Sequence, residues 1–334
     1  MSLHVFANFV TPFGTAANNR AETEGNMTTL QKLLWQGETH STVSAEAIRF
    51  AVRRILGASE KTNRTWDEIT RANAWKDWTF AGWGADGGDT FIDDDLLGFM
   101  TAEAAKQENE DPDAPAPTAV VVAAEGGGKK PKLPKAKGTA NVRRAVLEVT
   151  RAVSLTPWAG DVTFNAASPG ATPSASKGNK DAKRDTNPVP YGTEVHATRY
   201  QYGVALTPER LRDKSRAAKA VHALCNLGTV AGNHGRFLFD FSPDAVVIRL
   251  TDDPAPRLLY CFDTDDDGKT VHAKTLLQRL KAGDIAPAEL VFGVSDLDSK
   301  LAASLTAVGV KVFGVKKACE EAVRLINSKL AIKE

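Results

Sequence analysis

Cysteine and long apolar runs are scarce in this 334-residue sequence, and each absence excludes a class of protein. The cysteines Cys225, Cys261 and Cys319 lie far apart without C-x-x-C spacing, each within an apolar periodic stretch. We therefore expect buried free thiols in a reducing compartment. No run approaches the about 18 apolar residues of a membrane helix, and the N-terminus lacks the pattern of an export signal. We expect a cytoplasmic protein with no membrane partner.

Motifs of known catalytic, metal and cofactor sites are absent as well. The histidines show no H-x-x-x-H or Cys/His spacing, and no G-x-S-x-G elbow occurs. The segment Asp263–Gly268 resembles the first half of a calcium loop, but Lys274 stands where that loop requires a glutamate, so we predict a hairpin turn. Asp93–Asp95 would point in alternating directions on an extended segment, which we interpret as structural or as an acidic rim for a basic partner. We expect no catalytic residue, no metal and no cofactor.

The order of strand, helix and loop patterns predicts an α+β protein. These patterns are consistent with a β-α-β-β-α-β core that carries insertions. His196–Leu206 alternates as one strand, and a helix follows between Thr207 and Gly228. Residues 104–140 mix acid, Pro, Gly and Lys and cannot bury enough surface to fold, so we expect a mobile insertion. Residues 156–192 form a long polar excursion, which indicates a functional loop or hairpin arm.

Charge is segregated along the chain although the formal net charge is only +1. Acidic residues gather in 86–113, and basic residues gather in 129–151, 177–184 and 210–219. Contact with nucleic acid depends on the local patch, so near-zero net charge does not exclude such a partner. It does argue against indiscriminate binding of polyanions.

Residues 8–53 combine a strand, a polar loop and a helix in a pattern that predicts an anion-binding surface. Ser41 and Ser44 supply hydroxyls at the helix start, and Arg49 and Arg53 share one face at i, i+4 spacing opposite an apolar stripe. Hydroxyls and amides at a helix N-terminus, with two guanidiniums behind them, suit a phosphodiester backbone. An ordinary amphipathic helix with a solvated basic face is the alternative. The preceding loop adds amides and an arginine, which favours contact.

Two further segments could bind nucleic acid. Gly232–Arg236 reads G-N-H-G-R, in which glycines allow close backbone approach and Arg236 can form two hydrogen bonds to phosphate; a tight turn is the alternative. The motif matches neither G-x-G-x-x-G nor a Walker pattern. The 156–192 excursion mixes basic residues with aromatic residues such as Trp158, a combination that suits single-stranded nucleic acid. An ordinary surface loop is the alternative there.

Six motifs, in this order, resemble the backbone subunit of type I CRISPR effector complexes (Cascade), in the CRISPR-associated autoregulator or DevR-like family. They are T-P-F-G-T-A-A-N-N-R (11–20), H-S-T-V-S-A-E-A-I-R-F-A-V-R (40–53), F-I-D-D-D-L-L-G-F-M (91–100), T-R-A-V-S-L-T-P-W (150–158), V-H-A-T-R-Y-Q-Y (195–202) and G-N-H-G-R (232–236). They cover most of the chain except residues 104–140 and the part beyond about residue 249. Glu46 departs from the family's frequent Gln, and Phe50 departs from a frequent basic residue.

The resemblance implies a single domain over residues 1–334: a modified RRM-like (ferredoxin-like) palm with a thumb hairpin at residues 156–192 and a flexible insertion at 104–140. It implies a non-catalytic protein that binds CRISPR guide RNA and stacks further copies of itself into a helical filament. Other Cascade subunits and target DNA are the implied further partners. The residues expected to bind RNA are Asn18, Arg20, His40, Ser41, Ser44, Arg49, Arg53, Trp158, Lys177, Lys180, Lys183, Arg184, Gly232, Asn233, His234, Gly235 and Arg236.

Two other functions stay open. A related metal-independent endoribonuclease would process precursor CRISPR RNA and could use His40 or His234. A DNA-binding regulator would fit the word autoregulator, but the sequence shows no helix-turn-helix signature. Incubation with a labelled repeat RNA in the absence of metal distinguishes the nuclease from the binding protein.

Overall fold

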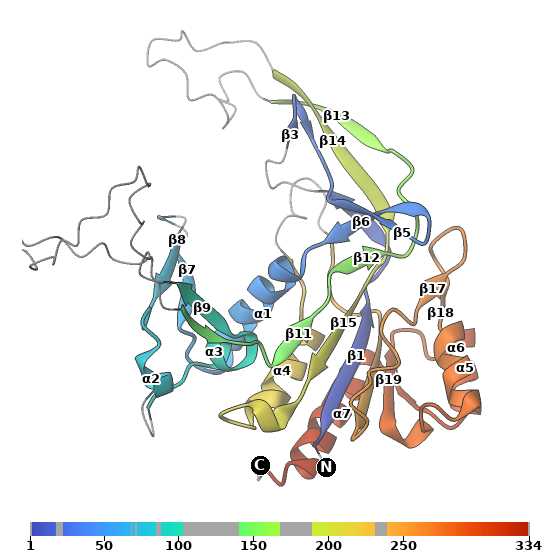
Figure 1. The fold of residues 1–334 in the computed structure, drawn as a ribbon. Coiled ribbons are helices and arrows are strands. Elements are labelled where there is room, and N and C mark those ends of the chain that lie inside the picture. Colours follow the sequence, from blue (N-terminus) through green and yellow to red (C-terminus); the bar gives the residue numbers. More distant parts are fainter. Residues whose placement is uncertain are drawn as a thin grey trace, which may run out of the picture.

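A large mixed sheet forms the centre of the protein (Figure 1). The computed structural model describes residues 2–17, 23–67, 69–70, 72–84, 88–102, 140–167, 189–230 and 239–332. The sheet has nine strands in the order β20-β19-β16-β1-β15-β12-β6-β5, with β11 also paired to β15. Their bounds are β1 (His4–Val10), β5 (Lys32–Trp35), β6 (Glu38–Val43), β11 (Leu147–Val149), β12 (Ala152–Ser154), β15 (Tyr200–Leu206), β16 (Ala245–Thr251), β19 (Leu290–Val294) and β20 (Lys311–Phe313). All these pairs are antiparallel except β19–β20.

Helices cover both faces of this sheet, because alternate side chains of its strands enter two different cores. In β1, Val5, Ala7 and Phe9 belong to one core, whereas Phe6 and Val10 belong to the other. The helices of the first core are α1 (Ala45–Ser59), α3 (Ile92–Leu97), α4 (Arg216–Cys225) and α7 (Val315–Lys329), and those of the second are α5 (Lys274–Ala282) and α6 (Lys300–Ala307). The predicted α+β architecture is confirmed, and the RRM-like assignment of its palm stays a prediction.

A disulfide bond joins α4 to α7. Cys225 and Cys319 have Cα atoms 6.4 Å apart, within the range that a disulfide requires. The expectation of free thiols is therefore wrong for these two cysteines, while Cys261 is free and buried. Their 94-residue separation in sequence hid the pairing, which depends on the packing of α4 against α7.

A smaller group of elements lies beside α1, on the left of Figure 1. It consists of β7 (Arg64–Asp67), β8 (Ala72–Trp75), α2 (Ala81–Gly84), α3 (Ile92–Leu97), β9 (Phe99–Ala102) and β10 (Ala140–Arg143). Strands β7 and β8 form one antiparallel hairpin, and β9 and β10 form a second antiparallel pair.

The three aspartates of α3 hold this group together. Asp93 accepts hydrogen bonds from the amides of Asn63 at 2.7 Å and Arg64 at 3.1 Å, and Asp94 accepts one from the Asn63 side chain at 2.9 Å. Asp95 is fully buried and pairs with the guanidinium groups of Arg143 and Arg216. Of the two interpretations given to these aspartates, the structural one is confirmed. The expected extended segment is wrong, since they lie on a helix.

An arm rises from the sheet at the top of Figure 1. Strands β13 (Val162–Ala167) and β14 (Val189–Thr198) pair antiparallel, so the described ends of the 156–192 excursion form a hairpin. Three short strands complete this sheet: β2 (Gly14–Ala17), β3 (Thr23–Glu24) and β4 (Met27–Thr28).

Several local predictions can be compared with the structure directly. The segment His196–Leu206 is two strands in different sheets, β14 and β15, with a break at Arg199, whose guanidinium bonds Asp244. The region predicted as one helix after Thr207 contains a 3-10 turn (Pro208–Arg210) before α4. The predicted turn at Asp263–Gly268 is confirmed: β17 (Asp263–Thr264) and β18 (Val271–His272) form an antiparallel hairpin.

Candidate nucleic-acid interface

The start of α1 is built from Ser44 and two buried residues of β6. Ser44 Oγ accepts a hydrogen bond from the Ala47 amide at 3.2 Å and caps the helix. His40 Nδ1 lies 2.7 Å from the Ser154 carbonyl oxygen, and Ser41 is completely buried. All three predicted contacts therefore have protein partners. What this stretch offers to an anion is the backbone amides of the first helical turn.

A hydrogen-bond chain through Ser41 connects β6, β14 and β15. The Tyr200 hydroxyl donates to Ser41 Oγ at 2.7 Å, Ser41 donates to His196 Nδ1 at 2.6 Å, and His196 Nε2 donates to the Pro157 carbonyl oxygen at 3.1 Å. These roles require a neutral imidazole, and burial lowers the pKa of His196 to about 4. The chain fixes the turn that precedes Trp158.

Trp158 lies at the base of the arm. Its Nε1 donates to the Val195 carbonyl oxygen of β14 at 3.0 Å, and Lys32 Nζ lies 3.9 Å from the ring centroid. The same ammonium contacts both carboxylate oxygens of Glu194 at 2.6 and 2.7 Å. Lys32 thus covers one face of the indole through a cation–π contact. A nucleobase that stacks here would use the other face.

Arg49 and Arg53 lie on the side of α1 that faces α3 and the β7–β8 hairpin. Arg49 donates to the Leu97 carbonyl oxygen, and Arg53 Nε lies 3.2 Å from Asp93 Oδ2. Burial, with a further contribution from the charge of Arg64, lowers the pKa of both arginines, to about 10 for Arg53. The partners of these two arginines thus lie in α3. The arginines do not join Ser41 and Ser44 in one contact surface, as the sequence had suggested.

The remaining predicted contacts lie outside the described residues: Asn18, Arg20, Lys177, Lys180, Lys183, Arg184, Gly232, Asn233, His234, Gly235 and Arg236. The described residues next to these three segments lie close together, at β14 and the start of β15. Strands β2 and β13, which precede two of these segments, both pair with β14. Phe239, which follows the third, has its ring centroid 5.3 Å from that of Tyr200 and packs beside Gly14 of β2.

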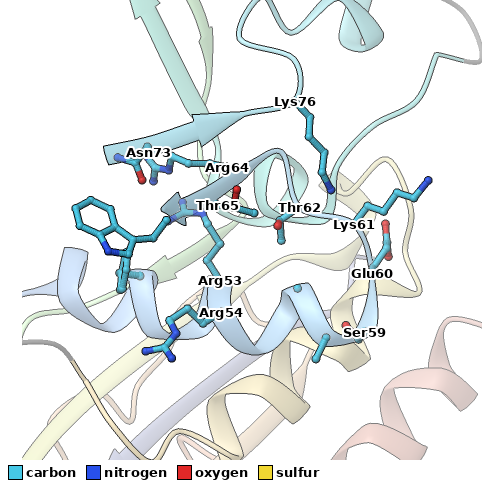
Figure 2. A pocket seen from close by; sticks show the side chains of 14 residues that line it. Arg53, Arg54, Ser59, Glu60, Lys61, Thr62, Arg64, Thr65, Asn73 and Lys76 are labelled. Carbon is cyan, nitrogen blue, oxygen red and sulfur yellow. The ribbon is translucent and has the colours of Figure 1, made fainter. Parts of the chain in front are cut away.

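A basic pocket between the second half of α1 and the β7–β8 hairpin was missed by the sequence analysis (Figure 2). It has a volume of about 570 Å³, and its lining includes Arg53, Arg54, Lys61, Arg64 and Lys76. Basic residues recur through residues 53–76 together with tryptophans, which is the signal that could have drawn attention to them. Their convergence depends on the hairpin folding over α1.

The described residues show neither a metal site nor a membrane-spanning helix. Within those ranges no cluster of three His, Cys, Asp or Glu side chains could hold a metal ion. None of the helices in the described part of the chain combines the length and apolar character needed to cross a bilayer.

Comparison with known proteins identifies the family. No family model matches the chain. A protein of Myxococcus xanthus (strain DK1622), described as CRISPR-associated protein Cas7/Cst2/DevR, is 60% identical over 294 residues, or 88% of this chain and 87% of that protein. Two solved chains, from a CRISPR RNA-guided surveillance complex and from such a complex described as pre-nicking, share the fold at 14% identity. The first has a TM-score of 0.52 and covers 96% of this chain and 99% of its own; the second has 0.51 and covers 97% and 100%. The motifs in residues 11–236 had predicted this outcome, and at 60% identity over most of its length the chain belongs to the Cas7/Cst2/DevR family of CRISPR-associated proteins.

Proposed function

We propose that this chain is a non-catalytic, guide-RNA-binding backbone subunit of a type I Cascade complex. In this proposal several copies bind side by side along one CRISPR RNA, contact other Cascade subunits and present the guide to target DNA. Family membership over 88% of the chain supports the assignment. So does a fold shared, over nearly the whole chain, with chains of CRISPR RNA-guided surveillance complexes. The proposal carries with it the cytoplasmic location expected from the sequence.

One structural observation carries the proposal: segments far apart in the sequence are anchored at one end of the main sheet. Strand β2 leads toward Asn18 and Arg20, the β13–β14 hairpin leads toward the basic excursion, and Phe239 follows Gly232–Arg236. All three anchors contact β14 or the adjoining Tyr200. Such convergence would let loops from separate segments grip one polynucleotide.

Backbone recognition suits this role. A guide must vary in sequence and keep its bases free to pair, so its carrier has to bind phosphate and ribose rather than base edges. Arginines and helix-start amides are the groups that bind phosphate irrespective of sequence.

We extend the proposal to the RRM-like character of the palm and to the thumb role of the β13–β14 arm.

The nuclease alternative gains no support from His40. Its Nδ1 is bonded to a backbone carbonyl, and the side chain is only 6% exposed, whereas a general base must reach its substrate. His234, the other candidate, lies outside the described residues.

A salt titration tests the proposal. Affinity of the purified chain for a single-stranded guide RNA should fall with rising salt, with a log–log slope of about −0.7 per phosphate neutralised. A flat titration, or no binding, contradicts the proposed function. In a parallel arm, the chain is incubated with labelled repeat RNA in EDTA; we expect intact RNA, and cleavage that disappears in His40→Ala or His234→Ala would instead support the nuclease.

A further inference from the structure

The pocket between α1 and the β7–β8 hairpin carries an excess of positive charge. Among the described residues that line it, five are cations and one, Glu60, is a carboxylate. That carboxylate is already engaged, since its Oε1 lies 2.9 Å from Arg216 Nε and its Oε2 lies 2.7 Å from Lys219 Nζ. Among the described residues, Arg54 and Lys61 make no ion pair. The pocket is therefore set up to receive an anion.

Two of these cations are held close together. Figure 2 shows Arg53 extending from α1 toward Arg64 on the hairpin above it. Burial of Arg53, and next the charge of Arg64, lower the pKa of the Arg53 guanidinium to about 10. Asp93, the carboxylate that pairs with Arg53, also accepts hydrogen bonds from two backbone amides. Like charges brought together in a partly buried site cost free energy, and a bound anion would offset that cost.

An aromatic wall stands beside the cations. Trp66 is 39% exposed, and its ring meets that of Phe50 edge to face with centroids 6.2 Å apart. Both residues line the pocket. A carboxylate-bearing peptide would make little use of an indole wall, whereas a nucleobase stacks on an aromatic ring regardless of its identity. The combination of cations and indole therefore favours a nucleotide over an acidic peptide.

We propose that this pocket binds one nucleotide of a single-stranded polynucleotide, with the phosphate among Arg53, Arg54 and Arg64 and the base against Trp66. A volume of about 570 Å³ lies within the range of small-molecule pockets, roughly 300–1,000 Å³. Arg54 lies ten residues beyond Ser44, or about 15 Å along α1, so this contact is separate from the helix start. The inference rests on the proposed function, because the strand it binds is either guide RNA or target DNA.

The test uses the full chain and labelled single strands of RNA and DNA with the same sequence. Trp66→Leu should weaken binding roughly 5- to 150-fold, the equivalent of about 1–3 kcal/mol for one stacked base. The double variant Arg54→Ala/Arg64→Ala should reduce the log–log salt slope by about 0.7 for each RNA phosphate that the variant no longer neutralises. Trp78→Leu and Arg257→Ala, which change exposed residues outside the pocket, are the matched controls and should bind like the wild type.

A second measurement does not depend on any variant folding correctly. Wild-type protein is irradiated with oligonucleotides containing 5-iodouracil, and the cross-linked peptide is identified by mass spectrometry. We expect a cross-link within residues 50–66. Cross-links confined to other segments, together with unchanged affinity of Trp66→Leu, would overturn the proposal.

Comparing RNA with DNA shows which nucleic acid the pocket binds, and it separates failure of this proposal from failure of the proposed function. Weaker binding of RNA alone assigns the pocket to the guide, and weaker binding of DNA alone assigns it to a target strand. Unchanged affinity for both, with loss of self-association, would overturn the proposal and assign the pocket to a second copy. Failure of the wild type to bind guide RNA contradicts the proposed function, while the DNA arm still decides what the pocket binds.

Discussion

Asp95 is the residue on which the packing of the smaller group of elements depends most. Its carboxylate bonds Arg216 Nη1 at 2.8 Å and the backbone amides of Arg212 and Asp213 at 3.0 and 3.1 Å, and it also pairs with Arg143. The side chain has no exposed surface. It therefore joins α3 to β10 and to the segment that precedes α4.

Replacing Asp95 should destabilise the fold strongly. Asp95→Ala leaves the partly buried Arg143 without its carboxylate partner Asp95 and leaves Arg216 with Glu60 alone. Removing one partner of a buried pair typically costs about 3–5 kcal/mol. The free energy of unfolding, measured in urea, should fall by that order. Asp266→Ala, which removes an exposed aspartate of the β17–β18 hairpin, is the control and should change stability little. A loss of under about 1 kcal/mol in Asp95→Ala would contradict this account.

Asp94 predicts a pH dependence of stability. Burial, and next the charge of Asp93, raise its pKa to about 7 from an ordinary 3.8. The folded state thus keeps a proton that the unfolded chain releases near pH 4, so this group makes stability decrease as pH rises from about 4 to about 7. Above pH 7 its contribution is constant.

Asp94→Asn isolates that effect. The amide oxygen can still accept the hydrogen bond from Asn63 Nδ2 but cannot ionise. We expect the variant to match the wild type near pH 4 and to exceed its unfolding free energy at pH 8, by at most about 4 kcal/mol. Urea unfolding at both pH values measures the difference. A gap between variant and wild type that does not change with pH would show that folding does not raise the pKa of Asp94.

At the scale of elements, the β13–β14 arm is supported independently of the basic excursion it carries. Six residue pairs connect the two strands, and the arm's base is fixed by Trp158 on the Val195 carbonyl and by Lys32 on Glu194. Changes within the excursion should therefore leave the fold intact.

Replacing Lys177, Lys180, Lys183 and Arg184 with Ala should weaken assembly on guide RNA by removing positive charge, with a smaller salt slope and an unchanged melting temperature. Gel-shift titration and thermal unfolding measure the two effects. Alanine at the exposed Lys274, Lys281, Lys300 and Lys311, which lie on α5, α6 and β20, removes the same charge and serves as control. If both quadruple variants assemble equally well, the arm does not grip RNA.

Sequence patterns predicted elements better than they predicted which elements meet. The turn at Asp263–Gly268 was predicted from its local residues, and the hairpin there confirms it. The length of the 156–192 excursion left a functional loop or a hairpin arm open, and the pairing of β13 with β14 shows the hairpin. Arg49 and Arg53 were read as an outward face because periodicity identifies only the stripe that is buried, Ala47 to Leu56. What covers the opposite face, namely α3 and the β7–β8 hairpin, cannot be derived from the helix itself.

At the scale of the whole molecule, the proposed function predicts assembly that depends on RNA length. If copies bind side by side by backbone contacts, the number bound should rise in steps as the single strand is lengthened. Mass photometry of complexes with RNAs of increasing length measures this. Double-stranded RNA of the same length is the control for general attraction to polyanions. A single bound copy at every length would contradict side-by-side binding.

By itself the sequence determined the mixture of strands and helices, the turn at Asp263–Gly268 and the family, because these depend on local periodicity and on the order of short motifs. Only the tertiary structure decided which residues share a site. It buried His40 and Ser41, turned Arg53 toward Arg64, enclosed Asp93–Asp95 and joined Cys225 to Cys319. The physical reason is that each pairing depends on packing between segments far apart in the chain, and a local pattern carries no information about its distant partner.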